Sequence, residues 1–267
     1  MGQRILVTGG TGVLGRAVVE RLLETGCTVR VASRRARPAG DGGRYEWAVV
    51  DLLSGRGAEK AMAGVDVVVH CASPLRGRTK EVRVACTVVD AAKRAGSPHV
   101  LYVSIVGVDR IPFGYYKGKL AAERLFTDSG LPHTILRATQ FHDLVRTLFA
   151  ATAKAPVMLV PGFGFQPIDV RDVADRLAEL ARGEPRGRVA DIGGPQARQA
   201  KDLARSYLTA TGRRRLVVPV RLPGATFRAF RQGGNLTAER VPGKITFEEY
   251  LAEHAEPVAV SYRGHRR

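Results

Sequence analysis

Three glycines near the start of the chain constrain the fold more than any other sequence feature. Gly9, Gly12 and Gly15 stand at three-residue intervals, after the apolar run RILVT and before a segment whose apolar residues have helical spacing. Gly9 permits a tight turn, Gly12 lets the main chain approach a pyrophosphate, and Gly15 lets the helix pack closely on a sheet. The pattern therefore predicts a strand–turn–helix unit that binds a dinucleotide at the helix N-terminus. The alternative is a glycine-rich turn without a ligand.

The end of the second apolar run indicates which dinucleotide is bound. NAD sites usually carry Asp or Glu there to bind the ribose 2′-hydroxyl, whereas arginine accommodates the 2′-phosphate of NADP. Here the run ends in Ser33-Arg34-Arg35 without a carboxylate, and two guanidinium groups are available to bind a phosphate. This favours NADP(H). The alternative is a pair of surface arginines in an arginine-rich chain.

Strand-like and helix-like segments alternate through the first half of the chain. Apolar runs follow at 28–33, 45–52, 65–73, 99–108 and 133–139, with helical segments around 57–62, 80–95 and 116–128. This order predicts an α/β protein with a doubly wound parallel sheet, the Rossmann fold. Beyond residue 141 the rhythm loosens, with helices expected at 170–181, 200–212 and 246–255 and a strand at 214–223. We expect a single NAD(P)-binding Rossmann-type domain over residues 1–267, with 141–267 contributing a smaller substrate-side lobe.

Composition, charge and cysteine spacing limit the location and the kinds of partner that we expect for this protein. No apolar run approaches the roughly 20 residues that span a bilayer, and the first apolar run starts too early for a signal peptide to precede it. Cys27, Cys71 and Cys86 lie far apart without metal-ligand spacing, so we expect reduced thiols, no metal and a cytoplasmic location. The net charge of +17 would suit a polyanion, but the basic residues are scattered. We therefore expect a small-molecule substrate, no specific nucleic acid and no membrane partner; a monomer and a homodimer both remain open.

Further motifs resemble a known family. VDLLS, HCAS, YVSIVGVD, YYKGKLAAE and LPHTILRATQF, together with the glycine motif, resemble the short-chain dehydrogenase/reductase superfamily and its atypical, NmrA-like NAD(P)H-binding branch. The resemblance implies that Asp51 binds the adenine amino group and that Ala72 lies along the adenine ribose. It also implies that Arg137-Ala138-Thr139 approaches the nicotinamide carboxamide, although the family often has proline where Ala138 stands. The residues expected to bind the cofactor are Gly9, Thr11, Gly12, Val13, Leu14, Gly15, Ser33, Arg34, Arg35, Asp51, Leu52, Cys71, Ala72, Ser73, Lys119, Ala138 and Thr139.

The resemblance also implies catalytic residues. Tyr115 and Lys119 have the Tyr-x-x-x-Lys spacing of the family, and residues four apart share one face of a helix. A cationic Lys119 would favour the phenolate of Tyr115, which could exchange a proton with a carbonyl or alcohol during hydride transfer. Lys119 would also bind the nicotinamide ribose. Ser104 is the third expected catalytic residue, although the family's hydroxyl often lies further on, where Ile105 and Val106 stand.

The sequence leaves alternative roles open for three further side chains. Tyr116, next to Tyr115, could be the ring that faces the cofactor. His142 and Asp143 could line the substrate cleft, although a lone histidine there is more often structural. Trp47, the single tryptophan, is expected to pack in the core.

The sequence therefore predicts an NADPH-dependent oxidoreductase that transfers hydride to a small carbonyl or quinone-like acceptor. A non-catalytic NADP(H)-sensing regulatory protein is the alternative, favoured by the missing hydroxyl at Ile105 or Val106. A nucleotide-sugar epimerase or dehydratase is a third possibility, disfavoured because the C-terminal half is short for a sugar-nucleotide lobe.

Overall fold

The computed structural model describes residues 2–74, 78–238 and 240–254. Six consecutive parallel strands make up most of its large sheet, in the order β6-β5-β4-β1-β2-β3. The chain thus runs outward from β1 in one direction and then returns to start β4 on the other side of β1. In sheets of this kind, ligands bind at the carboxyl ends of the strands where the order reverses, here β1 and β4. These strands are β1 (Arg4–Thr8), β2 (Thr28–Ser33), β3 (Glu46–Val49), β4 (Val67–His70), β5 (His99–Ile105) and β6 (His133–Ala138).

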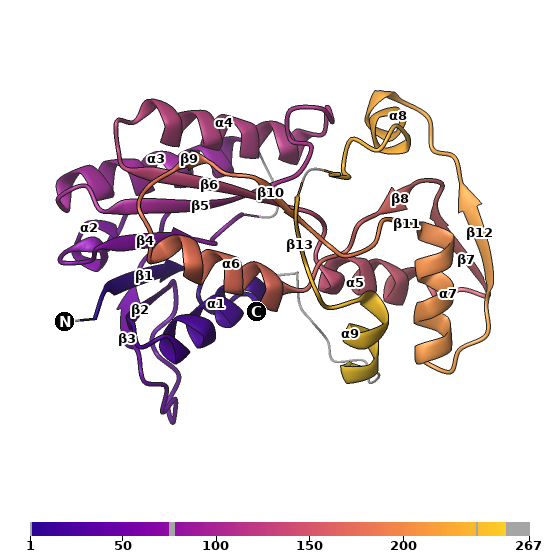
Figure 1. Ribbon diagram of the computed structural model, residues 1–267, viewed down its shortest axis with the longest axis horizontal. Helices are drawn as coiled ribbons and strands as arrows, with labels where there is room; N and C mark the ends of the chain where they lie inside the picture. Colours follow the sequence, from indigo (N-terminus) through magenta and orange to yellow (C-terminus); the bar gives the residue numbers. More distant parts are fainter. Residues whose placement is uncertain (1, 75–77, 239, 255–267) are drawn as a thin grey trace.

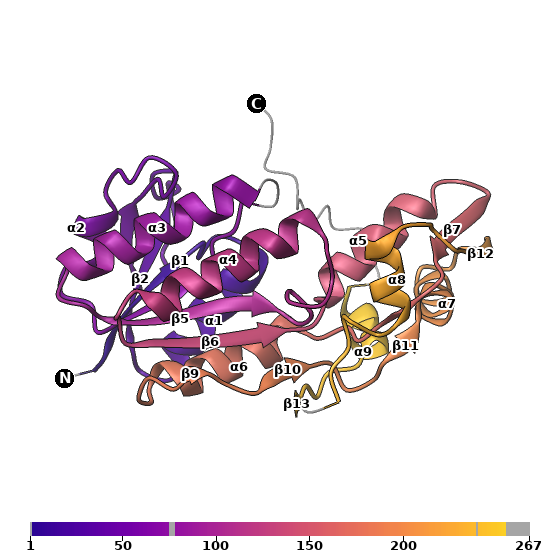
Figure 2. The ribbon, with the colours of Figure 1, turned by 90° about the horizontal axis from the view of Figure 1, so that it is seen from above.

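Helices cover both faces of the sheet, which confirms the doubly wound architecture (Figure 1). One face packs against α1 (Val13–Glu24) and α6 (Val170–Ala181), and the other against α2 (Ala58–Met62), α3 (Arg78–Arg94) and α4 (Gly114–Asp128). Figure 2 shows α3 and α4 side by side across the sheet. Alternate strand residues serve the two cores: Ile5 and Val7 face α1 and α6, whereas Leu6 faces the other helices.

The second half of the chain contributes to two regions. Beyond β6 the sheet continues with β10 (Asp191–Gly193) and β13 (Arg240–Pro242), while the short β9 (Gly187–Arg188) also pairs with β6. The segment that leads to β13 also contains α8 (Ala225–Arg231). Part of the chain after residue 141 therefore belongs to the large sheet, as β9, β10 and β13, and another part, α6, packs on it. The predicted division into a domain and a lobe at that residue stays a prediction.

The other elements form a cluster with its own core beyond the carboxyl ends of the strands (Figure 1). Phe149, Met158, Leu203 and Phe247 are buried there. The predicted helix after residue 246 begins with a capping box, in which Thr246 and Glu249 bond each other's main-chain N–H groups. The elements are α5 (His142–Thr152), β7 (Val157–Pro161), β8 (Gly164–Phe165), β11 (Arg198–Gln199), α7 (Ala200–Ala210), β12 (Leu216–Val220), α8 and α9 (Phe247–Glu253).

Trp47 packs against the core that contains Val29 and Val31, which confirms the prediction that it packs in the core. It lies half-buried on β3, the last strand on its side of the sheet, and its Nε1 donates to the carbonyl of Arg35 at 3.0 Å. A position at the sheet edge leaves one side of the indole ring in contact with solvent.

Among the described residues, none of the helices combines the length and the apolar character that crossing a membrane requires.

Candidate active site

The glycine-rich turn has the geometry that its sequence predicts. Gly9 has a φ of +68°, and a Cβ atom on it would lie 2.8 Å from the backbone of Ala72. A Cβ atom on Gly15 would lie 2.1 Å from the carbonyl oxygen of Gly9, so α1 packs directly against the turn. Gly12 is the N-cap of α1 and makes no side-chain cap. The first N–H groups of α1 are therefore free of a cap at the positive end of the helix dipole, where a pyrophosphate fits.

The arginines that follow β2 differ in how they are held. Arg34 and Arg35 are exposed, and neither guanidinium donates a hydrogen bond to another described residue. Arg37, in contrast, pairs with Asp41 at 3.6 Å and lies over the ring of Tyr45, 5.0 Å from its centroid. Of these three arginines, Arg34 and Arg35 are thus the two whose guanidinium groups are not already bound to other described residues.

Asp51 is engaged in its own turn at the end of β3. Its Oδ2 accepts a hydrogen bond from Ser54 Oγ at 2.8 Å, and its Oδ1 accepts one from the N–H of Leu53 at 3.0 Å. These bonds, with a smaller contribution from the charge of Arg34, hold the pKa of the Asp51 carboxyl below its ordinary value. Asp51 is therefore ionised and lies near Arg34, while the neighbouring Leu52 side chain is buried in the core.

The segment after β4 links the glycine turn to α4. Thr8 Oγ1, at the end of β1, accepts the N–H of Ala72 at 3.3 Å and hydrogen-bonds His70 Nδ1 at 2.7 Å. The next residue, Ser73, has its Oγ 2.9 Å from the phenolic oxygen of Tyr115 in the first turn of α4. The glycine-rich turn and the candidate catalytic tyrosine are therefore connected through Ala72 and Ser73 at the carboxyl ends of the strands.

A buried carboxylate that the sequence analysis did not predict organises this site. Glu81, in the first turn of α3, is 1% exposed. Its Oε2 accepts from Ser73 Oγ at 2.7 Å, and its Oε1 accepts from Tyr102 Oη at 3.0 Å and lies 3.0 Å from Lys119 Nζ. Lys119 Nζ also donates to the carbonyl of Val103 at 3.1 Å.

Glu81 and Lys119 form an ion pair within the protein. Burial alone raises the pKa of Glu81, but Lys119 and the Ser73 hydrogen bond outweigh it, so that the pKa is lowered. Burial alone lowers the pKa of Lys119, but Tyr102, Tyr115 and Glu81 outweigh it, so that the pKa is raised. Both groups are therefore charged at neutral pH, and Lys119 is linked to Tyr115 by hydrogen bonds through Glu81 and Ser73.

One sequence signal could have revealed Glu81. It stands on the same helix face as Ala85, Val88 and Ala92, all of which are buried. An acidic residue in an apolar register needs a buried partner. The sequence does not show which cation supplies it.

The structure separates the two adjacent tyrosines. Tyr116 is 7% exposed and packs edge-on against Phe113 and Phe230, with ring centroids 5.7 and 6.1 Å away, and burial raises its pKa. Tyr115 is half-buried and reaches the polar network through Ser73. Of the two, Tyr115 has the phenol that joins the polar network of Ser73 and Glu81.

The other predicted residues at the ends of β5 and β6 are buried. Ser104 is 2% exposed, and its Oγ has no hydrogen-bond partner among the described residues. Ala138 is the last residue of β6, and the Oγ1 of Thr139 accepts the N–H of Gly194 at 3.2 Å. The hydroxyl of Thr139 is therefore engaged in joining β6 to the segment after β10.

Arg137 points toward α4. Its Nε and Nη2 donate to the two carboxylate oxygens of Glu123 at 2.8 and 2.6 Å, and its Nη1 donates to Asp109 at 2.8 Å. These bonds tie β6 to α4 and to the loop after β5. The side chain of Arg137 is thus a structural connection.

His142 and Asp143 are also structural. His142 is fully buried, with its Nε2 3.1 Å from the carbonyl of Ile245, and Asp143 accepts a hydrogen bond from Tyr250 Oη at 3.1 Å. They connect α5 to the segment that leads into α9.

In the described part of the chain, metal-ligating and thiol groups form no second functional site. Within that part, no cluster of three or more His, Cys, Asp or Glu residues could hold a metal ion. Cys27, Cys71 and Cys86 are free thiols, and burial raises the pKa of Cys71 to about 12.

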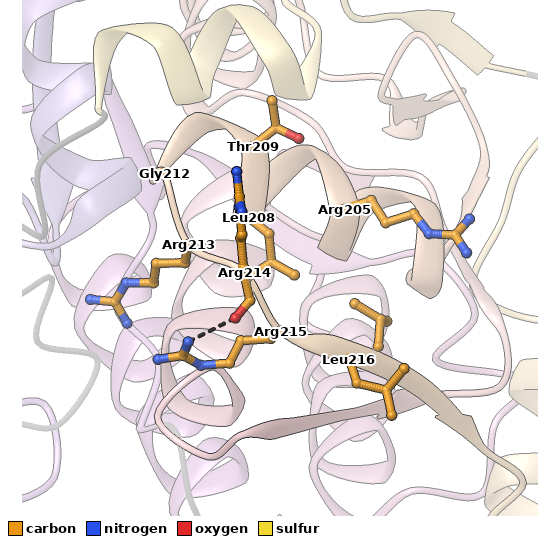
Figure 3. Close-up of a pocket in the computed structure, with 9 residues that line it drawn as sticks. Arg205, Leu208, Thr209, Gly212, Arg213, Arg214, Arg215 and Leu216 are labelled. Carbon is orange, nitrogen blue, oxygen red and sulfur yellow. Dashed lines mark hydrogen bonds between the residues drawn. The ribbon is translucent and has the colours of Figure 1, made fainter.

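One groove lies away from this site, between α7 and β12. It has a volume of about 660 Å³ and is open to solvent. Figure 3 shows the guanidinium groups of Arg205 and Arg213 on opposite sides of the view. Arg205 bonds Asp202, and Arg215 donates to the carbonyls of Ala153 and Arg214. The groove therefore has basic walls whose side chains diverge, and it contains none of the predicted site residues.

The sheet order, the glycine turn and the free arginines after β2 define a dinucleotide-binding protein of the Rossmann type. The family described as NAD(P)H-binding matches residues 9–184, and the chain belongs to this family. This confirms the resemblance stated from the sequence and the prediction that the chain binds NAD(P)H.

Several proteins resemble the chain over different lengths. It is 32% identical over 136 residues to an uncharacterised protein of Mycobacterium tuberculosis, covering 50% of this chain but 14% of that protein. It is 28% identical over 286 residues to a (4-alkanoyl-5-oxo-2,5-dihydrofuran-3-yl)methyl phosphate reductase of Streptomyces griseus, covering 96% of this chain and 99% of that one. It is also 28% identical over 236 residues to an NAD(P)H azoreductase of Xenophilus azovorans, covering 85% and 79%.

Solved structures share the fold. A nucleoside-diphosphate-sugar epimerase of Staphylococcus aureus has a TM-score of 0.80 at 19% identity, covering 94% of this chain and 100% of that one. The NADPH complex of a quinone oxidoreductase of Escherichia coli has a TM-score of 0.78 at 20% identity, covering 94% and 99%. At such identities the likeness establishes the Rossmann fold, which hosts several chemistries.

Proposed function

We propose that the chain is an NADPH-dependent reductase of a small carbonyl or quinone-like acceptor and that Tyr115 supplies the proton. The carrying observation is the contact between Ser73 and Tyr115, 2.9 Å apart, directly beside the Ala72 backbone against which Gly9 packs. Bound NADPH supplies the hydride in such a reaction. The Tyr115 phenol would donate its proton to the acceptor oxygen, on which negative charge develops during reduction.

The chain's own residues hold this phenol in place. Ser73 fixes its oxygen, while Glu81 and Lys119 anchor Ser73 from within the protein. Tyr116 and Phe230 place an apolar wall beside it, contributed by α4 and α8. We infer that the acceptor binds between α4 and the lobe to which residues 141–267 contribute.

The preference for NADPH over NADH is proposed from Arg34 and Arg35. Both are exposed at the end of β2 and free of hydrogen bonds to other described residues. A 2′-phosphate offers them charge-assisted hydrogen bonds that the 2′-hydroxyl of NAD does not.

The relatives support a reductase. The Streptomyces griseus reductase matches along almost its whole length, and the azoreductase matches along most of its length. The three free thiols support the proposal that the protein works in a reducing, cytoplasmic environment.

A non-catalytic NADP(H) sensor is the second candidate. It is favoured by the absence of a hydroxyl at Ile105 and Val106 and by the charge of Lys119, which Glu81 balances. The epimerase alternative has only the shared fold in its support.

One experiment separates these candidates. The purified protein is analysed for bound dinucleotide, and NADPH absorbance is followed with a panel of quinones, aldehydes, ketones and azo compounds. Acceptor-dependent oxidation supports the reductase. Tight NADPH binding without oxidation by any acceptor supports the sensor.

A further inference from the structure

Hydrogen-bond counting determines the direction of the contact between Tyr115 and Ser73. Ser73 has a single hydroxyl hydrogen, and its Oγ lies 2.7 Å from Glu81 Oε2 and 2.9 Å from Tyr115 Oη. An ionised carboxylate accepts hydrogen bonds but donates none. Ser73 therefore donates to Glu81, and Tyr115 must donate to Ser73. In the resting protein the phenolic hydrogen of Tyr115 therefore points toward Ser73 Oγ.

We propose that Glu81 is a positioning residue that fixes this direction. It thereby keeps the phenolic hydrogen of Tyr115 in a hydrogen bond to Ser73 until an acceptor oxygen takes the proton. The proposal rests on the proposed role of Tyr115 as the proton donor. When the proton is transferred, the O–H bond of Tyr115 breaks and one forms on the acceptor oxygen. Ser73 then turns its hydrogen from Glu81 to the phenolate, and no other proton moves.

The groups around Glu81 leave it as the anion of this cluster. His70, from β4, is neutral because burial, with a contribution from Lys119, lowers its pKa to about 4. Tyr102, from β5, and Tyr116, from α4, stay protonated because burial raises both pKa values. Lys119 is the cation, 3.0 Å from Glu81.

Replacing Glu81 by Gln reverses the chain of hydrogen bonds. Lys119 only donates, so the amide oxygen of Gln faces Lys119 and the amide NH₂ group faces Ser73. Ser73 then accepts from the amide and donates to Tyr115. The substitution also removes a negative charge next to the site of the phenolate. Both changes favour ionisation of Tyr115.

The test is an NMR titration of tyrosines labelled at ¹³Cζ in the whole protein, with the Tyr115 signal identified by its loss in Tyr115→Phe. Glu81→Gln should lower the ionisation midpoint of Tyr115 by about one pH unit or more. Ser73→Thr keeps a hydroxyl and should resemble the wild type. In a Ser73→Ala background, the shift caused by Glu81→Gln should shrink to less than half. A full shift in that background would overturn the role of Ser73.

Glu123→Gln is the matched control. Glu123 is also buried and ion-paired, but with Arg137, and should leave the Tyr115 midpoint unchanged. An equal shift in this variant would mean that any buried carboxylate has the effect and would overturn the proposal. Should Glu81→Gln fail to fold, neutron diffraction of the wild type decides: the deuteron between Tyr115 and Ser73 must belong to Tyr115, and one belonging to Ser73 overturns the proposal.

Turnover provides the separate readout. The alkaline limb of the kcat profile should move with the NMR midpoint in Glu81→Gln. If Tyr115→Phe retains full turnover, the proposed role of Tyr115 fails, whereas the titration and the deuteron positions still decide whether Glu81 sets the hydrogen-bond direction.

Discussion

Tyr115 in α4 reaches Ser73 after β4, with 2.9 Å between their hydroxyl oxygens. The contact joins the segment after β4 to the first turn of α4. Ser73 continues from the backbone packed on the glycine turn, and Tyr115 belongs to the helix that carries Lys119. This relationship makes the phenol separable from cofactor binding, because the glycine turn keeps its structure without the phenolic oxygen.

Tyr115→Phe should lower turnover by roughly 10²–10⁴-fold, the contribution of a positioned proton donor, with NADPH affinity nearly unchanged. The ring remains and only the hydroxyl is lost. Steady-state kinetics and an NADPH titration of the same preparation measure both effects. Tyr116→Phe is the control and should keep its turnover, since that phenol is buried among aromatic rings. A larger loss in Tyr116→Phe than in Tyr115→Phe would reverse the assignment.

Arg34→Ala should weaken NADPH binding by roughly ten- to hundredfold and leave NADH binding nearly unchanged. The loss corresponds to about 1.5–3 kcal/mol for one charge-assisted hydrogen bond. Calorimetric titration with both cofactors measures it. Arg37→Ala should have little effect on the ratio, because Arg37 is held by Asp41 and Tyr45. Equal affinities for NADPH and NADH in the wild type would contradict the proposed preference.

Gly15→Ala should abolish dinucleotide binding or destabilise the protein by several kcal/mol. Its Cβ atom would lie 2.1 Å from the Gly9 carbonyl oxygen, so α1 would have to move away from the turn. Thermal unfolding with and without NADPH measures both effects. Gly114→Ala is the control, because a Cβ atom there meets nothing within 4 Å and alanine favours the helix. Normal NADPH binding by Gly15→Ala would show that the close approach is not required.

His70 should make the protein less stable in mild acid. Burial, and then Lys119, lowers its pKa from 6.5 to about 4 in the folded state. Below pH 6.5 the unfolded chain takes up a proton that folded His70 does not. The free energy of unfolding therefore falls as the pH drops from 6.5 toward 4, by at most about 3 kcal/mol.

Chemical denaturation at pH 7 and pH 5 tests this pH dependence. His70→Phe keeps an aromatic ring against Tyr102 and should show a smaller loss of stability between the two pH values than the wild type. It removes one of the two hydrogen-bond partners of the Thr8 hydroxyl, at a cost of about 1–3 kcal/mol that should be the same at both pH values. An unchanged pH dependence in His70→Phe would show that this histidine does not titrate on unfolding.

The sequence by itself determined the features that depend on neighbouring residues. The glycine turn follows from a positive φ at Gly9 and from the absence of a side chain at Gly15, and both are local requirements. Strands β1 to β6 of the large sheet follow from apolar runs. The start of α9 follows from Thr246 and Glu249, whose capping box closes within one turn of helix.

Only the tertiary structure decided the features that join distant segments. The three-residue strand β13 pairs with β10 at the sheet edge, and a strand of that length carries too little pattern to be predicted. Glu81 is the clearest case, because the apolar register of α3 shows that it is buried but not which groups meet it. Lys119, Tyr102 and Ser73 reach it from α4, β5 and the segment after β4. A buried charge takes its partners from whichever elements pack around it, and that packing is a property of the whole fold.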